Sequence, residues 1–131
     1  MMAGVVNGAL EATLLLQIHG AASQTMETAV IDTGYNGALT LPFAVITTLA
    51  LTPLASRSVI LGDASRRVLD FYEAEVIWDD QRQSIPILCV EGVPLIGTAL
   101  LKGCRMEAEF FVGGQVQISV LCSQWPTEIT P

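Results

Sequence analysis

The sequence is poor in basic residues, and this scarcity excludes several kinds of partner. Lysine and arginine together number 6, against 13 aspartates and glutamates, so the formal net charge is −7. The one adjacent basic pair is Arg66-Arg67. Nucleic-acid binding requires clustered lysine and arginine, and anionic membrane surfaces attract polybasic segments in the same way. We therefore expect neither nucleic acid nor a membrane as a partner.

Residues that bind metals or form disulfides are also scarce. The chain has one histidine and three cysteines, Cys89, Cys104 and Cys122, with no CxxC spacing. Three cysteines cannot all pair within one chain, and structural zinc sites use several closely spaced cysteines and histidines. We expect reduced thiols, no metal and no other cofactor. A cytoplasmic location agrees with this expectation, because thiols stay reduced there.

The chain also has no long uninterrupted apolar segment. Residues 1–6 contain no lysine or arginine, which a secretory signal peptide would place before its apolar part. The most apolar stretch, 38–55, is interrupted by Pro42 and Pro53, whereas a membrane-spanning helix needs about 20 consecutive apolar residues. With 131 residues, 51% of them hydrophobic, the chain is expected to fold as one domain. The apolar surplus also indicates a buried interface between subunits.

Alternating apolar residues and frequent turn residues predict a mostly β domain, either a closed barrel or a sandwich. Residues 1–8 are either a loose end or an edge strand. The expected strands cover 10–19, 25–31, 38–41, 58–61, 66–78, 84–90, 106–112 and 115–121.

Proline and glycine give the remaining local predictions. Pro42 is expected to begin a short helix, and residues 51–56 to form a proline-containing loop. Pro86 has no amide hydrogen to donate, so it is expected at a sheet edge or a bulge. A second short helix is expected between Thr98 as its cap and Gly103 as its end. Gly113-Gly114 is expected to form a two-residue hairpin turn.

The most informative stretch is 29–37, in which an apolar strand ends at an acidic residue. Ala29, Val30 and Ile31 favour a buried strand, and Asp32-Thr33-Gly34 follows directly. Burying an unpaired charge is costly. Asp32 is therefore expected at a solvated cleft or beside a group that shares its proton. By itself, an aspartate at the end of a strand is more often an ordinary turn residue.

Two motifs together give the chain a family likeness. Val30-Ile31-Asp32-Thr33-Gly34 is followed much later by Leu95-Ile96-Gly97-Thr98-Ala99-Leu100-Leu101. Between them lie a strand ending in Leu41-Pro42, a predicted helix and a projecting hairpin. Over residues 10–121 the chain resembles the retropepsin-like aspartic proteases, above all the small single-domain bacterial members. The likeness implies a closed β-barrel of the acid-protease fold, with one or two short helices and one Asp-Thr-Gly loop per chain. Residues 1–9 precede this domain, and a tail, 122–131, follows it.

The resemblance implies an aspartic endopeptidase that hydrolyses peptide bonds in peptide or protein substrates. One chain supplies one Asp32, so two chains would form a homodimer and activate a water between their two Asp32 carboxylates. It assigns support of the active-site loop to Thr33, Gly34, Leu95, Ile96 and Gly97, and the substrate-covering flap to Gly62, Asp63 and Ala64.

This sequence departs from the viral pattern in several places, including a flap with one glycine, Gly62, instead of a glycine-rich tip. Tyr35-Asn36-Gly37 follows Asp-Thr-Gly where viral enzymes carry small and acidic residues, and Thr98 stands where they often carry arginine. The alternative function is a non-catalytic peptide-binding or dimerisation module on the same fold. For the interface between subunits, 115–121 is the first candidate strand, and Val5-Val6 is the second.

Overall fold

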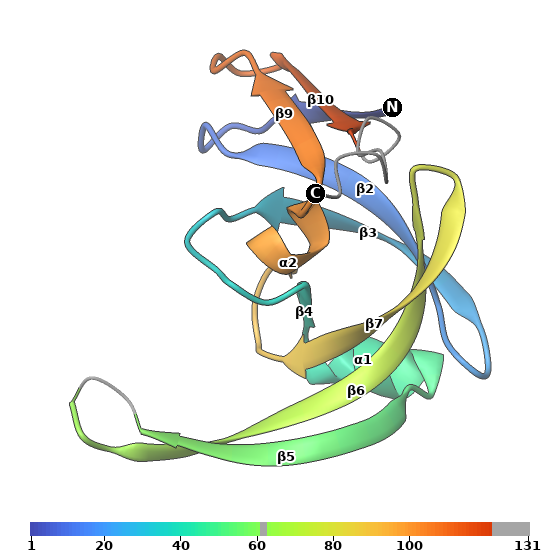
Figure 1. Ribbon diagram of the computed structural model, residues 1–131, viewed down its shortest axis with the longest axis vertical. Helices are drawn as coiled ribbons and strands as arrows, with labels where there is room; N and C mark the ends of the chain where they lie inside the picture. Colours follow the sequence, from blue (N-terminus) through green and yellow to red (C-terminus); the bar gives the residue numbers. More distant parts are fainter. Residues whose placement is uncertain (61–62, 122–131) are drawn as a thin grey trace, which may run out of the picture.

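A computed structural model describes residues 1–60 and 63–121 of the chain (Figure 1). The predicted tail 122–131, with Cys122, and the predicted flap residue Gly62 lie outside these residues. The described part forms these elements: β1 (Met2–Val6), β2 (Ala12–His19), β3 (Gln24–Ile31), β4 (Leu39–Leu41), α1 (Phe43–Leu49), β5 (Thr52–Ile60), β6 (Arg66–Trp78), β7 (Gln81–Cys89), β8 (Leu95–Ile96), α2 (Thr98–Leu101), β9 (Cys104–Ala108) and β10 (Gln115–Val120).

Six of the strands close into a barrel with mixed strand directions. Their order is β6-β7-β4-β8-β3-β2, and β2 returns to β6 through the pairs Ile18–Val76 and His19–Glu75. The pairs β3–β8 and β4–β7 are parallel, and the other neighbouring pairs are antiparallel. The sequence correctly predicted a mostly β protein with a closed barrel and two short helices.

The core follows the alternation of the strands. On β2, Leu14, Leu16 and Ile18 are all buried because every second side chain of a strand points to the same face. All three residues of β4, 39–41, are buried, so both faces of this strand are covered. Ile46 and Leu49, the buried residues of α1, belong to the same core cluster.

Two parts of the sheet extend beyond the barrel. On one side the order continues from β2 through β1 and β10 to β9. Residues 2–6 therefore form an interior strand, and neither alternative for residues 1–8, a loose end or an edge strand, is correct. On the other side, β5 and the first half of β6 form a hairpin that projects from the barrel (Figure 1).

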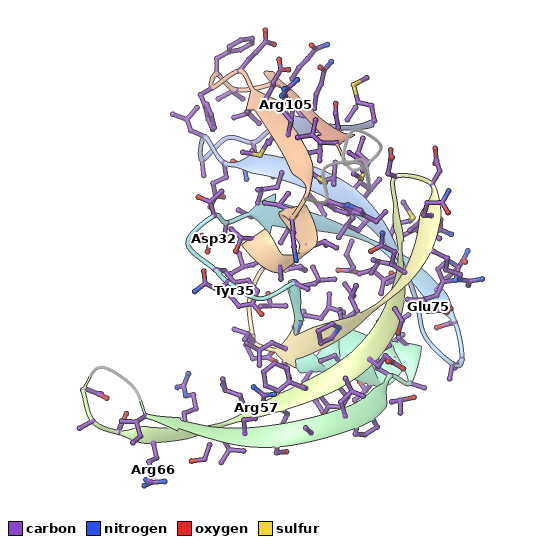
Figure 2. All side chains as sticks on the ribbon, in the orientation of Figure 1. Asp32, Tyr35, Arg57, Arg66, Glu75 and Arg105 are labelled. Atoms are coloured by element: carbon purple, nitrogen blue, oxygen red, sulfur yellow. The ribbon has the colours of Figure 1, made fainter. Side chains whose placement is uncertain are left out.

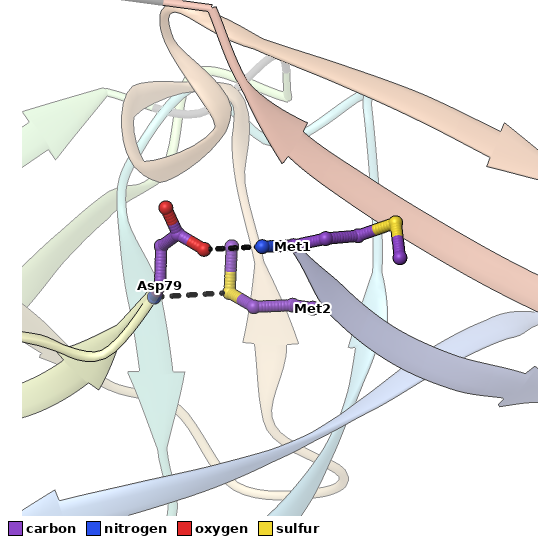
Figure 3. Close-up of polar contacts among 3 residues, drawn as sticks. All are labelled: Met1, Met2 and Asp79. Carbon is purple, nitrogen blue, oxygen red and sulfur yellow. Dashed lines mark hydrogen bonds and ion pairs between the residues drawn. The ribbon is translucent and has the colours of Figure 1, made fainter.

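The chain start is attached to the turn between β6 and β7. The amino group of Met1 lies 2.7 Å from Asp79 Oδ1, and the Asp79 amide donates to the sulfur of Met2 at 3.3 Å (Figure 3). Asp79 and Asp80 have φ values of 53° and 63°. Two consecutive positive values are typical of the type I′ turn, whose twist matches that of a hairpin.

Two predicted turn regions were wrong. The expected loop 51–56 lies mostly in β5, which continues from residue 52 to residue 60 with an irregularity between Pro53 and Ala55. β5 is an edge strand, so a proline there need not donate to a second neighbour. β9 ends at Ala108 instead of 112, and a longer loop replaces the two-residue turn. In that loop the Gly114 amide donates to the Phe111 carbonyl.

Two predictions at Pro86 and Thr98 also need correction. β7 is an interior strand, but β4 pairs with it only from Ile87 onward. Pro86 therefore pairs with β6 on one side and lacks a strand partner on the other. Gly97, rather than Thr98, occupies the N-cap of α2. The helix ends at Leu101 with Lys102 as its C-cap, and Gly103 follows with a φ of 79°, as expected for a glycine that ends a helix.

Candidate functional site

Asp32 lies directly after the buried end of β3, at the start of a tight turn. Its amide donates to the Ile96 carbonyl at 2.9 Å, and its carbonyl accepts from the Tyr35 amide at 3.1 Å. The Gly34 amide donates to the carboxylate oxygen Oδ1 at 2.9 Å. The side chain is half-buried. The turn therefore fixes the direction of the carboxylate and leaves it open to solvent.

Strand β8 holds the Asp32 turn from the side of the core. It lies between β3 and β4, pairing in parallel with Val30 and Ile31 and antiparallel with Leu39. Ile96 is fully buried. The structure thus brings Leu95 and Ile96 beside the strand that ends at Asp32, although more than 60 residues separate them in the sequence.

Gly97 is required by the close approach of the loop that follows Asp32. A Cβ atom at this position would collide with the Gly37 carbonyl oxygen and with the ring of Tyr35. Beyond Gly97, the Thr98 amide donates to the Tyr35 carbonyl at 2.8 Å. The first turn of α2 therefore binds the loop that carries the candidate site.

Tyr35 is a site residue that the sequence reading treated only as a departure from the viral pattern. Partial burial raises the pKa of its phenol above the ordinary value of 10.0. A Cβ atom on Gly37 would collide with the Tyr35 hydroxyl. In the sequence, this contact corresponds to a tyrosine followed two residues later by a glycine, Tyr35 and Gly37. The glycine leaves room for the aromatic ring.

Thr33 and Gly34 form the exposed tip of the turn. A Cβ atom on Gly34 would lie 3.2 Å from Asp32 Oδ1, which is tighter than an ordinary contact. Glycine is therefore favoured at position 34, because it has no side chain to crowd the hydrogen bond between its amide and Asp32 Oδ1. Thr33 is also one of the residues that line the groove beside Asp32.

A groove of about 440 Å³ opens beside Asp32. It contains a second acid, Glu11, whose carboxylate accepts from the Asn7 side-chain amide at 3.0 Å. The remaining lining is largely apolar: Leu10, Ala12, Val30, Ile31, Thr33, Leu95, Met106 and Phe110. Sequence reasoning missed Leu10, Met106 and Phe110, because strand alternation does not show which side chains lie next to Asp32.

The predicted flap residues lie at the end of the β5–β6 hairpin. The Asp63 carboxylate accepts from the amide and hydroxyl of Ser65, at 3.0 and 2.6 Å. These two bonds, with the charge of Arg67, lower the pKa of the Asp63 carboxyl. Ala64 has a positive φ of 68°. Figure 2 shows the hairpin and Asp32 on the same side of the molecule, with the hairpin tip standing away from the Asp32 turn.

Other candidate chemistry is not gathered at this groove. His19 lies at the β2–β6 seam, where its Nδ1 accepts from Arg82 at 2.9 Å. Among residues 1–60 and 63–121, no three His, Cys, Asp or Glu side chains are grouped closely enough to bind a metal ion. Neither helix in the described chain is long and apolar enough to cross a membrane.

Comparisons of the chain with protein-family models, with curated proteins and with solved structures find no match. The Asp32 carboxylate, bound by the Gly34 amide, shares a partly apolar groove with Glu11, which is bound by the Asn7 side chain. A long hairpin extends on the same side of the molecule. One carboxylate can accept a proton, but a second acid is needed to protonate a leaving group in the same reaction.

Proposed function

We propose that the protein is a homodimeric aspartic endopeptidase with the retropepsin-like form of the acid-protease fold, and that each chain contributes Asp32. The observation that carries this proposal is the Asp32 turn, with its carboxylate directed by the Gly34 amide and opening into a groove. Insertion of β8 between β3 and β4 supports it further, because this insertion joins the two motifs on which the family likeness rests.

Two Asp32 carboxylates meeting across a two-fold axis would provide both halves of the chemistry. Two like charges in contact do not both ionise, so the pair would share one proton and titrate as a unit. The ionised carboxylate takes a proton from a water molecule, which attacks the peptide carbonyl carbon. The protonated carboxylate donates to the developing oxyanion, and the pair then protonates the leaving amine.

The neighbours of Asp32 position the carboxylate in this proposal. The Gly34 amide orients Oδ1, and Ile96 accepts from the Asp32 amide. Gly97 lets the Tyr35 loop approach α2 closely. Thr33, exposed at the tip, would contact the other subunit near the axis.

The exposed apolar residues beside the groove suggest where the second subunit packs. Phe110, Phe111 and Val112 are 62%, 60% and 66% exposed in the loop after β9, and Phe110 also lines the groove with Asp32. β9 is the last strand of the sheet order, whereas β10 and β1 are paired on both sides. Of the two edge strands of the described sheet, β5 and β9, the one next to these apolar residues is β9. We therefore propose β9 and the loop after it as a further candidate for the subunit contact, beside the first candidate strand at 115–121 and the second at Val5-Val6.

The decisive experiment compares wild type with Asp32→Asn on a diverse peptide library between acidic and neutral pH. We expect cleavage by wild type, no cleavage by Asp32→Asn, and a dimer for both in analytical ultracentrifugation. Glu11→Gln is the matched control, because it neutralises the other acid of the groove and should leave cleavage in place.

Two outcomes would contradict the proposal. A chain that remains monomeric at high concentration with bound peptide cannot form the pair of carboxylates. Peptide binding without any cleavage by wild type would instead favour the non-catalytic binding module.

A further inference from the structure

The core-facing side of β7 becomes polar toward the β6–β7 turn. Ile85 is buried and belongs to the core cluster. Gln83 and Gln81 follow at alternate positions, so they share its face of the strand, but both are exposed. Their partners on β6 are Val76 and Trp78, which are buried. The interior of the barrel therefore opens to solvent at these two glutamines.

A cavity of about 470 Å³, here called the barrel-mouth cavity, lies at this opening. One wall is the face of β7 just described, and another is the pair Cys104–Val120 of β9 and β10. The lining is completed by Ala38, Trp78, Asp79, Pro86, Ala99, Leu100 and Lys102. Barrel mouths are frequent places for small-molecule sites, whose volumes are roughly 300–1,000 Å³.

Helix α2 forms a fixed wall of the barrel-mouth cavity. Its residues Ala99 and Leu100 line the cavity. The Ala99 amide donates to the Gly37 carbonyl at 3.1 Å, and the Gly97 amide donates to the Ala38 carbonyl at 3.0 Å. The cavity and the groove beside Asp32 have no lining residue in common. An inference about the cavity therefore does not rest on the proposed protease activity.

Lys102 places a positive charge at the barrel-mouth cavity. It is the only lysine in the sequence, and its side chain is exposed. The ion pairs in the described part of the chain are Met1–Asp79 and Arg82–Glu75, so no carboxylate there lies at ion-pair distance from Lys102. Asp79, the acid in the lining, is bound by the Met1 amino group at 2.7 Å (Figure 3).

The two glutamines add hydrogen-bond donors beside an apolar floor. A glutamine side chain has two N–H donors, and those of Gln81 and Gln83 are without a hydrogen-bond partner in residues 1–60 and 63–121. Ile85 and Leu100 are buried apolar residues of the same lining. The barrel-mouth cavity thus combines one cation, several uncharged donors and apolar surface.

We propose that the barrel-mouth cavity binds a small amphipathic carboxylate. The carboxylate would contact Lys102 and the two glutamines, and the apolar chain would pack against Ile85 and Leu100. One positive charge matches a ligand with one negative charge. Salt at physiological concentration screens the net charge of −7 beyond roughly 8 Å, so the charges at the cavity determine whether an anion binds.

The test measures ligand binding to the full chain by isothermal titration calorimetry. Octanoate is compared with octanol, which has the same chain without the charge. We expect octanoate to bind about fivefold more tightly in low salt, since exposed ion pairs contribute modestly. This preference should approach unity at about 1 M salt, where the Debye length is about 3 Å. Hexanoate should bind more weakly than octanoate, by about fourfold for each CH₂ group removed.

Two charge variants identify the group that binds the carboxylate. Lys102→Met removes the charge and keeps an apolar chain of similar length. We expect it to bind octanoate and octanol equally, with octanol binding as in wild type. Arg105→Gln is the matched control, because Arg105 is exposed and, next to Cys104 on β9, points to the other face of the strand. It should retain the preference for octanoate.

A variant that fills the space identifies the cavity. Ala99 is exposed and lines the cavity. Ala99→Leu should therefore weaken octanoate and octanol alike, by about tenfold. Ala44→Leu is the control, because Ala44 is an exposed residue of α1 outside the lining, and it should bind as wild type. Circular dichroism confirms that each variant is folded.

Four results would overturn the inference. They are absence of octanoate binding, an octanoate preference retained in Lys102→Met, an equal loss of the preference in Arg105→Gln, and wild-type binding by Ala99→Leu. Asp32→Asn should bind octanoate as wild type does, because Asp32 does not line the cavity. Peptide cleavage has no part in these measurements, so failure of the proposed protease activity and failure of this site are separate findings.

Discussion

The Asp32 turn and the β5–β6 hairpin lie on the same side of the molecule but are built in opposite ways. The turn is bound by β8, α2 and its own amides, and the strands behind it are buried. The exposed half of the hairpin has no core behind it, and its described residues from 53 to 58 and from 63 to 68 are all exposed. A carboxylate that acts on a reacting bond must be held rigidly, whereas a segment that covers a peptide must be able to move.

The largest predicted effect concerns the rigid side. Ile96→Ala should lower the free energy of unfolding by about 2–5 kcal/mol, because it leaves a cavity where the side chain is fully buried. Chemical denaturation measures the loss. Ile60→Ala on the hairpin, where the side chain is 67% exposed, is the control and should change little. Equal losses at the two positions would refute the contrast between the regions.

Gly97→Ala should have the next largest effect. The added methyl group would collide with the Gly37 carbonyl and the Tyr35 ring, so we expect a loss of about 1–3 kcal/mol and displacement of the Asp32 turn. Thermal unfolding and peptide cleavage measure the two consequences. Gly8→Ala is the control, because a Cβ atom there meets no neighbour. Full stability of Gly97→Ala would show that the loop does not pack as described.

A pair of substitutions on β6 tests where the hairpin leaves the core. Val76 is fully buried and Val68 is 64% exposed. Val76→Thr should cost about 1–3 kcal/mol because it buries a hydroxyl group, whereas Val68→Thr should stay within about 0.5 kcal/mol. Denaturation of the two variants gives the comparison on a single strand. A large loss at Val68 would mean that the hairpin is packed in the protein as it exists in solution.

The smallest predicted effect is a pH dependence at Tyr35. Burial raises its phenol pKa above the ordinary value of 10.0, so the folded state retains a proton that the unfolded state loses. Stability from this group is present below pH 10 and declines as the pH rises through the folded pKa. The melting temperature of wild type should fall more steeply above pH 10 than that of Tyr35→Phe. Identical alkaline profiles would show that the ring is solvated.

The local sequence pattern predicted where helices and strands lie better than it predicted which strands pair with one another. The limits of β6 and the helix after Pro42 were correct because alternation and proline act within a few residues. The wrong loop at 51–56 has a tertiary cause, since pairing with β6 stabilises a strand that Pro53 alone disfavours. The longer loop after β9 depends on Gly114 reaching Phe111, which composition does not reveal.

The candidate site was predictable in part. The end of a strand at Asp32 followed from Val30, Ile31 and Gly34. Contact between the Asp32 turn and Leu95-Ile96 came only from the resemblance, since strand order over 60 residues is not encoded locally. The groove beside Asp32 includes Phe110, so its shape depends on where β9 and the loop after it lie relative to the Asp32 turn. The alternation of apolar residues along a strand does not predict that position.

The insertion of β8 between β3 and β4 also sets the order in which the site can form during synthesis. The strand that ends at Asp32 is complete when the first quarter of the chain has left the ribosome, but its neighbour β8 begins at Leu95. Until then, β3 and β4 lack the strand that joins them, and contacts between distant segments form slowly. A growing chain therefore exposes the edges of β3 and β4 until Leu95 and Ile96 have been synthesised, and the Asp32 turn acquires its support only then.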